Sequence, residues 1–262
     1  MPLQTNAYKS FKAEAERLTN LVVLFSHSVP VLARVLGDSA AAGVVPIKPA
    51  DNFPHDRADG PLLLQWAKDY DQDLARLIVL SVFSYFEAYI RGALIEMYEL
   101  QGGQNSFIKI AERRAARHWA LPTGSVAEAK RRLQARDHKG KTDRFKKFSK
   151  ILDEAGFAFP PDLLSVYGAQ QLAEKLGLKS KSSFRAYEIP DLLSYAILCP
   201  PTAAERKMFE DIRGLRNKVA HGTTPVITVH AAIKKSTALR KWAARVDAHL
   251  GEHFLVLAKY SK

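Results

Sequence analysis

The sequence of 262 residues has little cysteine, fewer acidic than basic residues, and no long uninterrupted apolar run. Its single cysteine, Cys199, excludes an internal disulfide framework and a zinc site built from several cysteines, and it fits a reducing cytoplasm. The stretch MPLQTNAYKSFKAEAERLTN is polar and mixed in charge, unlike a secretory signal. The apolar run from Leu21 to Leu36 is broken by His27, Pro30 and Arg34 and is too short to span a bilayer. We therefore expect a soluble, cytoplasmic protein with no membrane contact.

Sequence motifs for the common cofactors are also missing. The chain has no Walker loop, no GxGxxG and no GxSxG elbow, so it gives no sign of nucleotide-phosphate, dinucleotide or serine-hydrolase chemistry. His249 and His253 lie four residues apart, but neither an HExxH motif nor a third ligand accompanies them. We expect neither a cofactor nor a metal.

Basic residues outnumber acidic ones, and the excess is concentrated in one segment. The formal charge is +12 and the isoelectric point is near 9.7, which favours polyanionic partners such as RNA. Residues 104 to 150 hold 14 Lys and Arg against four Asp and Glu, most of the total excess. The alternative is an ordinary solvated helical surface. If the segment binds RNA, the candidate contacts are Arg113, Arg114, Arg117, Arg131, Arg132, Lys146 and Lys147, with Arg213 further along the chain.

Strand signals are scarce and helical periodicity is frequent, so the sequence predicts an all-α fold. The expected helices cover about 8–36, 61–100, 202–221 and 231–260. In the first, Pro30 is expected to kink or end the helix and Gly37 to close it. Gly102 and Gly103 should end the second. Thr202 is the expected N-cap of the third, with Glu205 three residues on. We expect one domain, 1–262, into which 104–187 is inserted as a basic helical segment between the second and third core helices.

The stretch RGLRNKVAHG, residues 213–222, places polar groups at the end of the third helix. Arg213, Asn217 and His221 are four residues apart and form one row beside the expected buried stripe of Met208, Ile212, Leu215 and Val219. Arg216 precedes His221 by five residues, which is about 140° around an ideal helix.

This stretch resembles the signature of the HEPN superfamily, helical bundles that share an Arg, often an Asn next, two to four further residues and then a His. RNKVAHG is a close form of that motif, and LSVFSYFEAYIRGAL is similar to the second bundle helix of antiviral and toxin-type members. The resemblance covers the bundle helices and leaves out residues 104–187.

The resemblance implies a metal-independent endoribonuclease that acts on single-stranded RNA or tRNA. His221 would be the general acid or base, since imidazole exchanges protons near neutral pH. Arg216 would hold the scissile phosphate, and Asn217 would position the histidine or a phosphate oxygen. Glu87 would orient Arg216.

The resemblance also implies partners. Two copies would form a homodimer with a composite active site, and a toxin–antitoxin or antiphage role would bring an antitoxin or defence-system partner. Some members carry a Tyr two residues after the His, which their antitoxin modifies. Thr223 stands at that position here, which puts that route of regulation in doubt.

Other interpretations remain open at this stage. The same bundle could be a non-catalytic module that binds RNA, a nucleotide or a protein, and a DNA-binding regulator is a weaker option because no helix-turn-helix is evident. His221 could simply favour the negative end of the helix dipole. Arg216 could pair with a nearby acid, and Glu87 with Arg91.

Overall fold

The computed structural model describes residues 4–41, 60–100, 102–103, 105–106, 109, 185–197 and 199–255. Within those residues every regular element is helical, so the all-α prediction is confirmed. The elements are α1 (Asn6–Ala41), α2 (Gly60–Leu100), the short 3-10 turn η2 (Ala186–Glu188), α7 (Ile189–Ala196), α8 (Ala203–Ala220) and α9 (Val229–His253).

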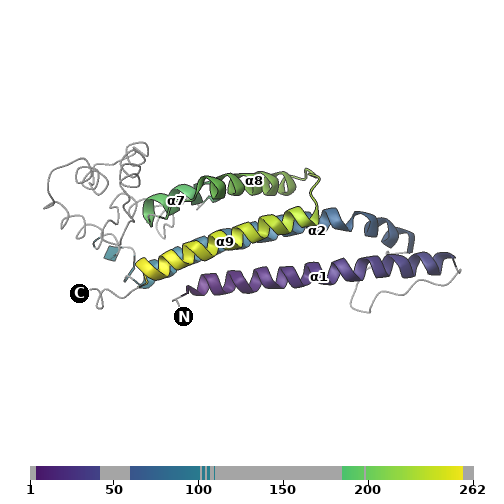
Figure 1. Ribbon diagram of the computed structural model, residues 1–262, viewed down its shortest axis with the longest axis horizontal. Coiled ribbons are helices and arrows are strands. Elements are labelled where there is room, and N and C mark those ends of the chain that lie inside the picture. Colours follow the sequence, from purple (N-terminus) through teal and green to yellow (C-terminus); the bar gives the residue numbers. More distant parts are fainter. Residues whose placement is uncertain are drawn as a thin grey trace.

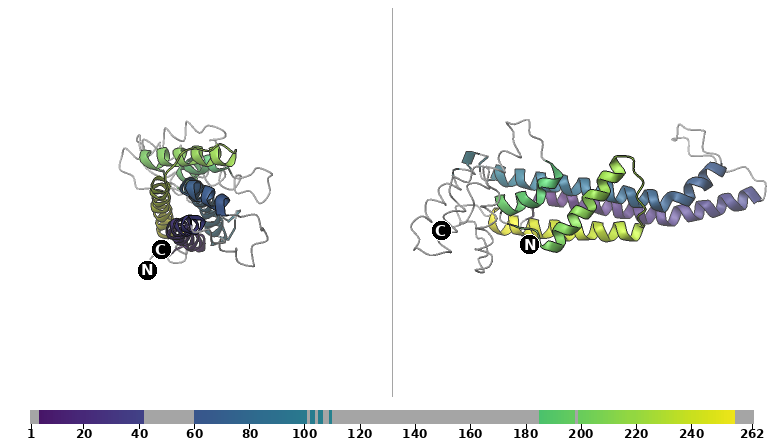
Figure 2. Two further views of the ribbon diagram at one scale, coloured as in Figure 1. Left: turned by 90° about the vertical axis from the view of Figure 1, so that its right-hand side faces the viewer. Right: turned by 90° about the horizontal axis from the view of Figure 1, so that it is seen from above.

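The four long helices form an elongated bundle (Figure 1). Helices α1 and α2 run antiparallel, and α9 lies alongside α2. Seen end-on, α1 and α8 lie on opposite sides of the pair formed by α2 and α9 (Figure 2). The C-terminal part of α1 and the first turns of α2 extend together beyond α8 and α9 (Figure 1).

The core of the bundle is a cluster of aromatic rings contributed by all four long helices. Phe209 of α8 stacks on Phe83 with ring centroids 5.4 Å apart, and Trp242 of α9 packs on Phe86 at 5.0 Å. Phe11 of α1 closes the other side of Phe86 at 6.4 Å. These rings bury large apolar areas and prefer tilted or edge contacts, so they hold α8 against α2 and α9.

Helix α2 has a fully buried apolar stripe, whereas the predicted stripe of α8 is displaced. Phe83, Phe86, Ile90, Leu94 and Met97 are all essentially inaccessible to solvent. In α8 the fully buried residues are Phe209 and Ile212, while Met208, Leu215 and Val219 are only partly buried. The stripe is displaced because α8 crosses both α2 and α9, so Phe209 inserts among rings from two helices.

The end predicted for α1 was wrong. The helix passes through Pro30 and Gly37 and ends at Ala41. Leu36 is buried, so the turns after the proline keep a packed apolar face. A glycine ends a helix when it adopts a positive φ, and Gly37 does not.

The predicted end of α2 at Gly102 and Gly103 was right. The predicted end of α9 was several residues too late. Gly102 and Gly103 have φ values of 81° and 89°, and their N–H groups donate to the carbonyls of Glu99 and Tyr98. Helix α9 ends at His253, where the sequence suggested about residue 260.

Almost all of the predicted basic insertion lies outside the described residues. The candidate RNA contacts Arg113, Arg114, Arg117, Arg131, Arg132, Lys146 and Lys147 are among the residues not described. Near the end of the predicted insertion, η2 begins at Ala186.

Two helices are long and apolar enough by composition to cross a membrane. They are Asn6–Asp38 and Pro61–Leu100, and each contains a window of mean hydropathy 1.4. The window in Pro61–Leu100 is 50% buried in the bundle, as expected of a core helix, while that in Asn6–Asp38 is only 11% buried. A cytoplasmic location therefore stays a prediction.

Candidate functional site

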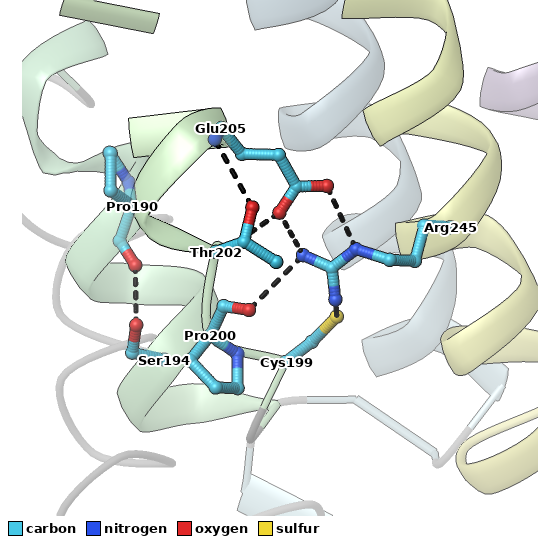
Figure 3. A network of polar contacts seen from close by, with 7 residues as sticks. All are labelled: Pro190, Ser194, Cys199, Pro200, Thr202, Glu205 and Arg245. Atoms are coloured by element: carbon cyan, nitrogen blue, oxygen red, sulfur yellow. Dashed lines mark hydrogen bonds and ion pairs between the residues drawn. The ribbon is translucent and has the colours of Figure 1, made fainter. Parts of the chain in front are cut away.

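Arg216, Asn217 and His221 lie at the C-terminal end of α8, so the orientation of α8 sets their positions. A polar network holds the first turn of this helix (Figure 3). Thr202 and Glu205 form the predicted capping box: the Glu205 N–H donates to Thr202 Oγ1 at 3.1 Å, and the Thr202 N–H donates to Glu205 Oε2 at 2.7 Å. The guanidinium of Arg245, on α9, then donates to both Glu205 oxygens at 2.7 and 3.0 Å.

The same guanidinium also contacts the segment that precedes α8. It donates to the Pro200 carbonyl at 3.1 Å and to Cys199 Sγ at 3.3 Å. Burial tends to raise the pKa of Glu205, but the hydrogen bonds from Arg245 and Thr202 outweigh it and lower the pKa below its ordinary value. Burial raises the pKa of the Cys199 thiol, which favours its protonated form. The network fixes the direction of α8 relative to α9.

The other end of α8 turns sharply into the segment that leads to α9. Gly222 has a φ of 76°, and the Thr223 N–H returns to the Lys218 carbonyl at 2.9 Å, as in a glycine-terminated helix. The connecting segment is tied to α2, because the Ile227 N–H donates to Gln72 Oε1 at 3.1 Å. His221 therefore occupies the capping position of a helix whose two ends are both fixed.

Arg216 and Asn217 contact one another. Arg216 Nη1 donates to Asn217 Oδ1 at 3.3 Å, and both side chains are half-buried. The Arg216 Nε is buried with no hydrogen-bond partner in the part of the chain that the structure describes. A guanidinium has five N–H donors, and apart from the buried Nε and the one Nη1 donor bonded to Asn217, the others make no hydrogen bond among the described residues and could bind an anion.

Glu87 of α2 interacts electrostatically with Arg216. Burial raises the pKa of the Glu87 carboxyl, and the positive charge of Arg216 partly offsets that rise. The two residues come from different helices, so their interaction depends on the packing of α8 on α2. Of the four residues singled out as catalytic, the structure therefore places Arg216 and Asn217 in contact and Glu87 within electrostatic range of Arg216.

His221 is not joined to that group in a single protomer. Its side chain is exposed, and among the described residues it makes no hydrogen bond to Arg216 or Asn217. Arg213, the candidate RNA contact on α8, is half-buried and donates through Nε and Nη2 to Glu210 at 2.9 and 2.6 Å.

The simpler pairings considered for these side chains are not formed among the described residues. Glu210 pairs with Arg213 and leaves Arg216 without an acidic partner within salt-bridge distance. No ion pair joins Glu87 to Arg91, although both lie within the described part of α2.

Sequence reasoning missed two side chains of α2. Gln72 accepts the hydrogen bond from Ile227, and Arg76 lies one turn further along the same helix face. Arg76 Nε is buried and, like that of Arg216, has no hydrogen-bond partner among the described residues, while its Nη1 pairs with Asp73 at 2.8 Å. The cue available in the sequence was the spacing of Gln72 and Arg76, four residues apart, but nothing indicated which segment they would face.

The arrangement suits anion binding more than metal binding. Among residues 4–41, 60–100 and 185–255 with their gaps, no group of three or more His, Cys, Asp and Glu side chains is placed to hold a metal ion. A half-buried arginine with unused donors beside an amide can instead orient a phosphate, and an exposed histidine close by in sequence can exchange protons.

Comparison with known proteins finds no matching family model, no matching curated protein and no matching solved structure.

Proposed function

We propose that the protein is a metal-independent endoribonuclease of the HEPN type that cleaves single-stranded RNA or tRNA. The observation that carries the proposal is that the Arg216 side chain is half-buried but has few hydrogen-bond partners among the described residues. Its guanidinium is half-buried, makes a single long hydrogen bond to Asn217 within the described residues, and lies on the same helix end as His221. The Nη donors of Arg216 that are not bonded to Asn217 could bind phosphate oxygens, which supports a phosphate-binding role for this side chain.

The chemistry that fits these side chains is attack of a ribose 2′-hydroxyl on the adjacent phosphorus. One histidine would accept the 2′-hydroxyl proton as the new P–O bond forms, and a second acid would protonate the 5′-oxygen as the old bond breaks. The products are a 2′,3′-cyclic phosphate and a 5′-hydroxyl. Arg216 would stabilise the charge that develops on the phosphate oxygens.

The exposure of His221 supports a site completed by a second copy of the chain. Within one protomer no hydrogen bond directs the imidazole toward Arg216. In a homodimer whose two α8 ends face one another, His221 from a second copy would approach the Arg216 phosphate site and supply the second proton-transfer group. The basic segment 104–150 would bind the RNA backbone through phosphate contacts.

The experiment is a digest of end-labelled tRNA and unstructured RNA in EDTA. Wild-type protein is compared with His221→Ala, Arg216→Ala and the control His230→Ala, which alters another exposed histidine near the start of α9. The proposal expects cyclic-phosphate ends from the wild type and the control, and a loss of about 100-fold or more for the first two variants. Equal cleavage by all four proteins would contradict it.

A second candidate is a non-catalytic RNA-binding module. It is favoured by the separation of His221 from Arg216 in the single protomer. In that case none of the proteins would cut, binding would weaken with salt, Arg216→Ala would bind more weakly, and His221→Ala would bind as the wild type does.

The biological role belongs to the same proposal. A metal-free ribonuclease of this kind would suit a cytoplasmic toxin or an antiphage defence protein, held inactive by an antitoxin or defence-system partner.

A further inference from the structure

Helix α1 carries apolar side chains on two different faces. One face packs in the bundle core through Phe11, Leu18 and Val22, and Leu36 further along the helix is also buried. The other remains exposed although it contains large apolar residues, and no Asp, Glu, Lys or Arg stands between Arg17 and Arg34. A helix that is apolar on more than one face is normally covered on each of them.

The exposed face has the spacing of a helix-pairing seam. Leu21, Leu24, Ser28, Val31 and Val35 follow one another at alternating steps of three and four residues, and we call this row the outer seam. Leu24 and Val31 are 59% and 63% exposed. The side chains of Phe25 and Leu32 flank the row and are also exposed. Alternation of three and four residues keeps a row on one side of a helix and is the pattern of paired helices.

A lipid bilayer is a poor match for the outer seam because of the neighbouring part of α2. Ala7 lies against Gly92, where an added Cβ would come within 3.0 Å of the Ala7 Cβ. Since α1 and α2 run antiparallel, the outer seam comes level with about residues 64–78 of α2. That stretch carries five charged side chains: Lys68, Asp69, Asp71, Asp73 and Arg76. A membrane that covered the outer seam would have to accommodate these charges, which is unfavourable.

The charges at the two ends of the outer seam match a second copy of the same helix. Arg17 precedes it and pairs with Glu14 of its own helix, and Asp38 follows it and pairs with Arg34 of its own helix. In an antiparallel pair centred on Ser28, Arg17 of one copy comes level with Asp38 of the other. A parallel pair would instead place like charges together at both ends, which is destabilising.

We propose that the outer seam of α1 is a self-association surface, on which two copies of the chain pair antiparallel about Ser28. Leu21 then lies level with Val35 of the second copy, and Leu24 with Leu32. The small Ser28 side chain at the two-fold axis allows the helices to approach closely. The pairing is isologous, since the same patch serves both copies. The exposed ion pairs at the ends of the seam contribute little and can be exchanged for contacts between copies at little cost.

This surface is distinct from the composite active site of the proposed function. Helix α1 lies on the opposite side of α2 and α9 from α8 (Figure 2), so pairing through the outer seam does not bring the two His221 side chains together. The two proposals therefore succeed or fail separately. A chain that used both surfaces would form tetramers or longer assemblies.

The test is the mass of the full-length chain, measured by sedimentation over a range of concentrations. Val31→Asp and Leu24→Asp place a charge on the outer seam, and each should weaken self-association by about tenfold or more. Val23→Asp is the matched control, because Val23 is 51% exposed on the same helix but lies off the outer seam. All three substitutions are at exposed positions, so unfolding curves should show that every variant folds.

Two further variants test the antiparallel register. Ser28→Cys should form an intermolecular disulfide under mild oxidation, whereas Val23→Cys should not; the native Cys199 is buried and does not interfere. Arg17→Asp should weaken association by about two- to fivefold, and adding Asp38→Arg should restore it.

Three results would overturn the inference. The first is a monomer at every concentration, as expected if residues 42–59 cover the outer seam within one chain. The second is an oligomer that Val31→Asp and Leu24→Asp leave unchanged. The third is a monomer that floats with phosphatidylcholine vesicles and loses that property in Val31→Asp, which would assign the outer seam to a lipid surface.

Discussion

Arg245 of α9 donates two hydrogen bonds to the carboxylate of Glu205, from Nη2 at 2.7 Å and from Nε at 3.0 Å. Glu205 lies in the first turn of α8, while Arg216, Asn217 and His221 lie at its far end. A bidentate contact restricts orientation as well as position, so it sets the direction of α8 relative to α9. The placement of these three residues therefore depends on the Arg245–Glu205 ion pair, although neither partner of that pair belongs to the candidate site.

Replacing Arg245 with Ala should lower the free energy of unfolding by about 2 kcal/mol, because hydrogen bonds to charged groups are lost and Glu205 keeps a half-buried charge. The pKa of Glu205 is lowered in the folded protein, so the stabilisation is present above its ordinary value of 4.5 and is lost as pH falls through the lowered value. Denaturant unfolding of wild type and Arg245→Ala at pH 7 and pH 3 measures both effects, with Lys241→Ala as an exposed control. A deficit that stays constant with pH would contradict the assignment.

Two glycines, one inside α8 and one in the turn that follows it, should respond to alanine with opposite changes in stability. Gly222 has a φ of 76°, so Gly222→Ala should destabilise the protein by about 1 kcal/mol through backbone strain alone, since an added Cβ meets no atom within 4 Å. Gly214 lies inside α8 with the same open surroundings, and Gly214→Ala should stabilise it by about 0.5–1 kcal/mol. Thermal unfolding should show a lower melting temperature than the wild type for Gly222→Ala and a higher one for Gly214→Ala. If the proposed function holds, Gly222→Ala should also reduce cleavage, because it alters the turn beside His221.

Replacing Glu87 with Gln should raise stability at neutral pH and reduce activity. The pKa of Glu87 is raised by burial, so its contribution to stability is complete below its ordinary value of 4.5 and declines as pH rises through the raised value. Glutamine keeps the shape without the charge and should remove that decline. If Glu87 orients Arg216, cleavage by Glu87→Gln should fall while stability rises. Unchanged activity would assign Glu87 to packing alone.

The ionisation of Asp247, like that of Glu87, should lower the free energy of unfolding as pH rises. Its carboxylate is buried and accepts hydrogen bonds from the Thr5 N–H and Oγ1, and burial raises its pKa above the ordinary value of 3.8. Stability should therefore decrease as pH rises through the raised pKa. Asp247→Asn keeps an acceptor for Thr5 and removes the charge, so its unfolding free energy should vary less with pH between 4 and 8. A steeper dependence than that of the wild type would contradict the assignment.

Local features of α8 were predicted well because local chemistry determines them. A threonine three residues before a glutamate satisfies the free N–H groups of a helix start, and both bonds of that box are present. Gly222 ends the helix because it alone tolerates a positive φ. The end predicted for α1 at Gly37 was wrong, because neither Pro30 nor Gly37 interrupts the helix and Leu36 between them is buried.

The sequence by itself determined the all-α class, the start and end of α8, and the presence of Arg216, Asn217 and His221 on its last turns. These follow from periodicity and capping, which act over a few residues. Tertiary structure alone decided that Arg216 comes within electrostatic range of Glu87 and that Gln72 accepts the hydrogen bond from the segment after His221. It also decided which apolar face of α1 is buried and which is left exposed. The reason is that these relationships depend on how helices distant in the chain cross, and no local pattern encodes that crossing.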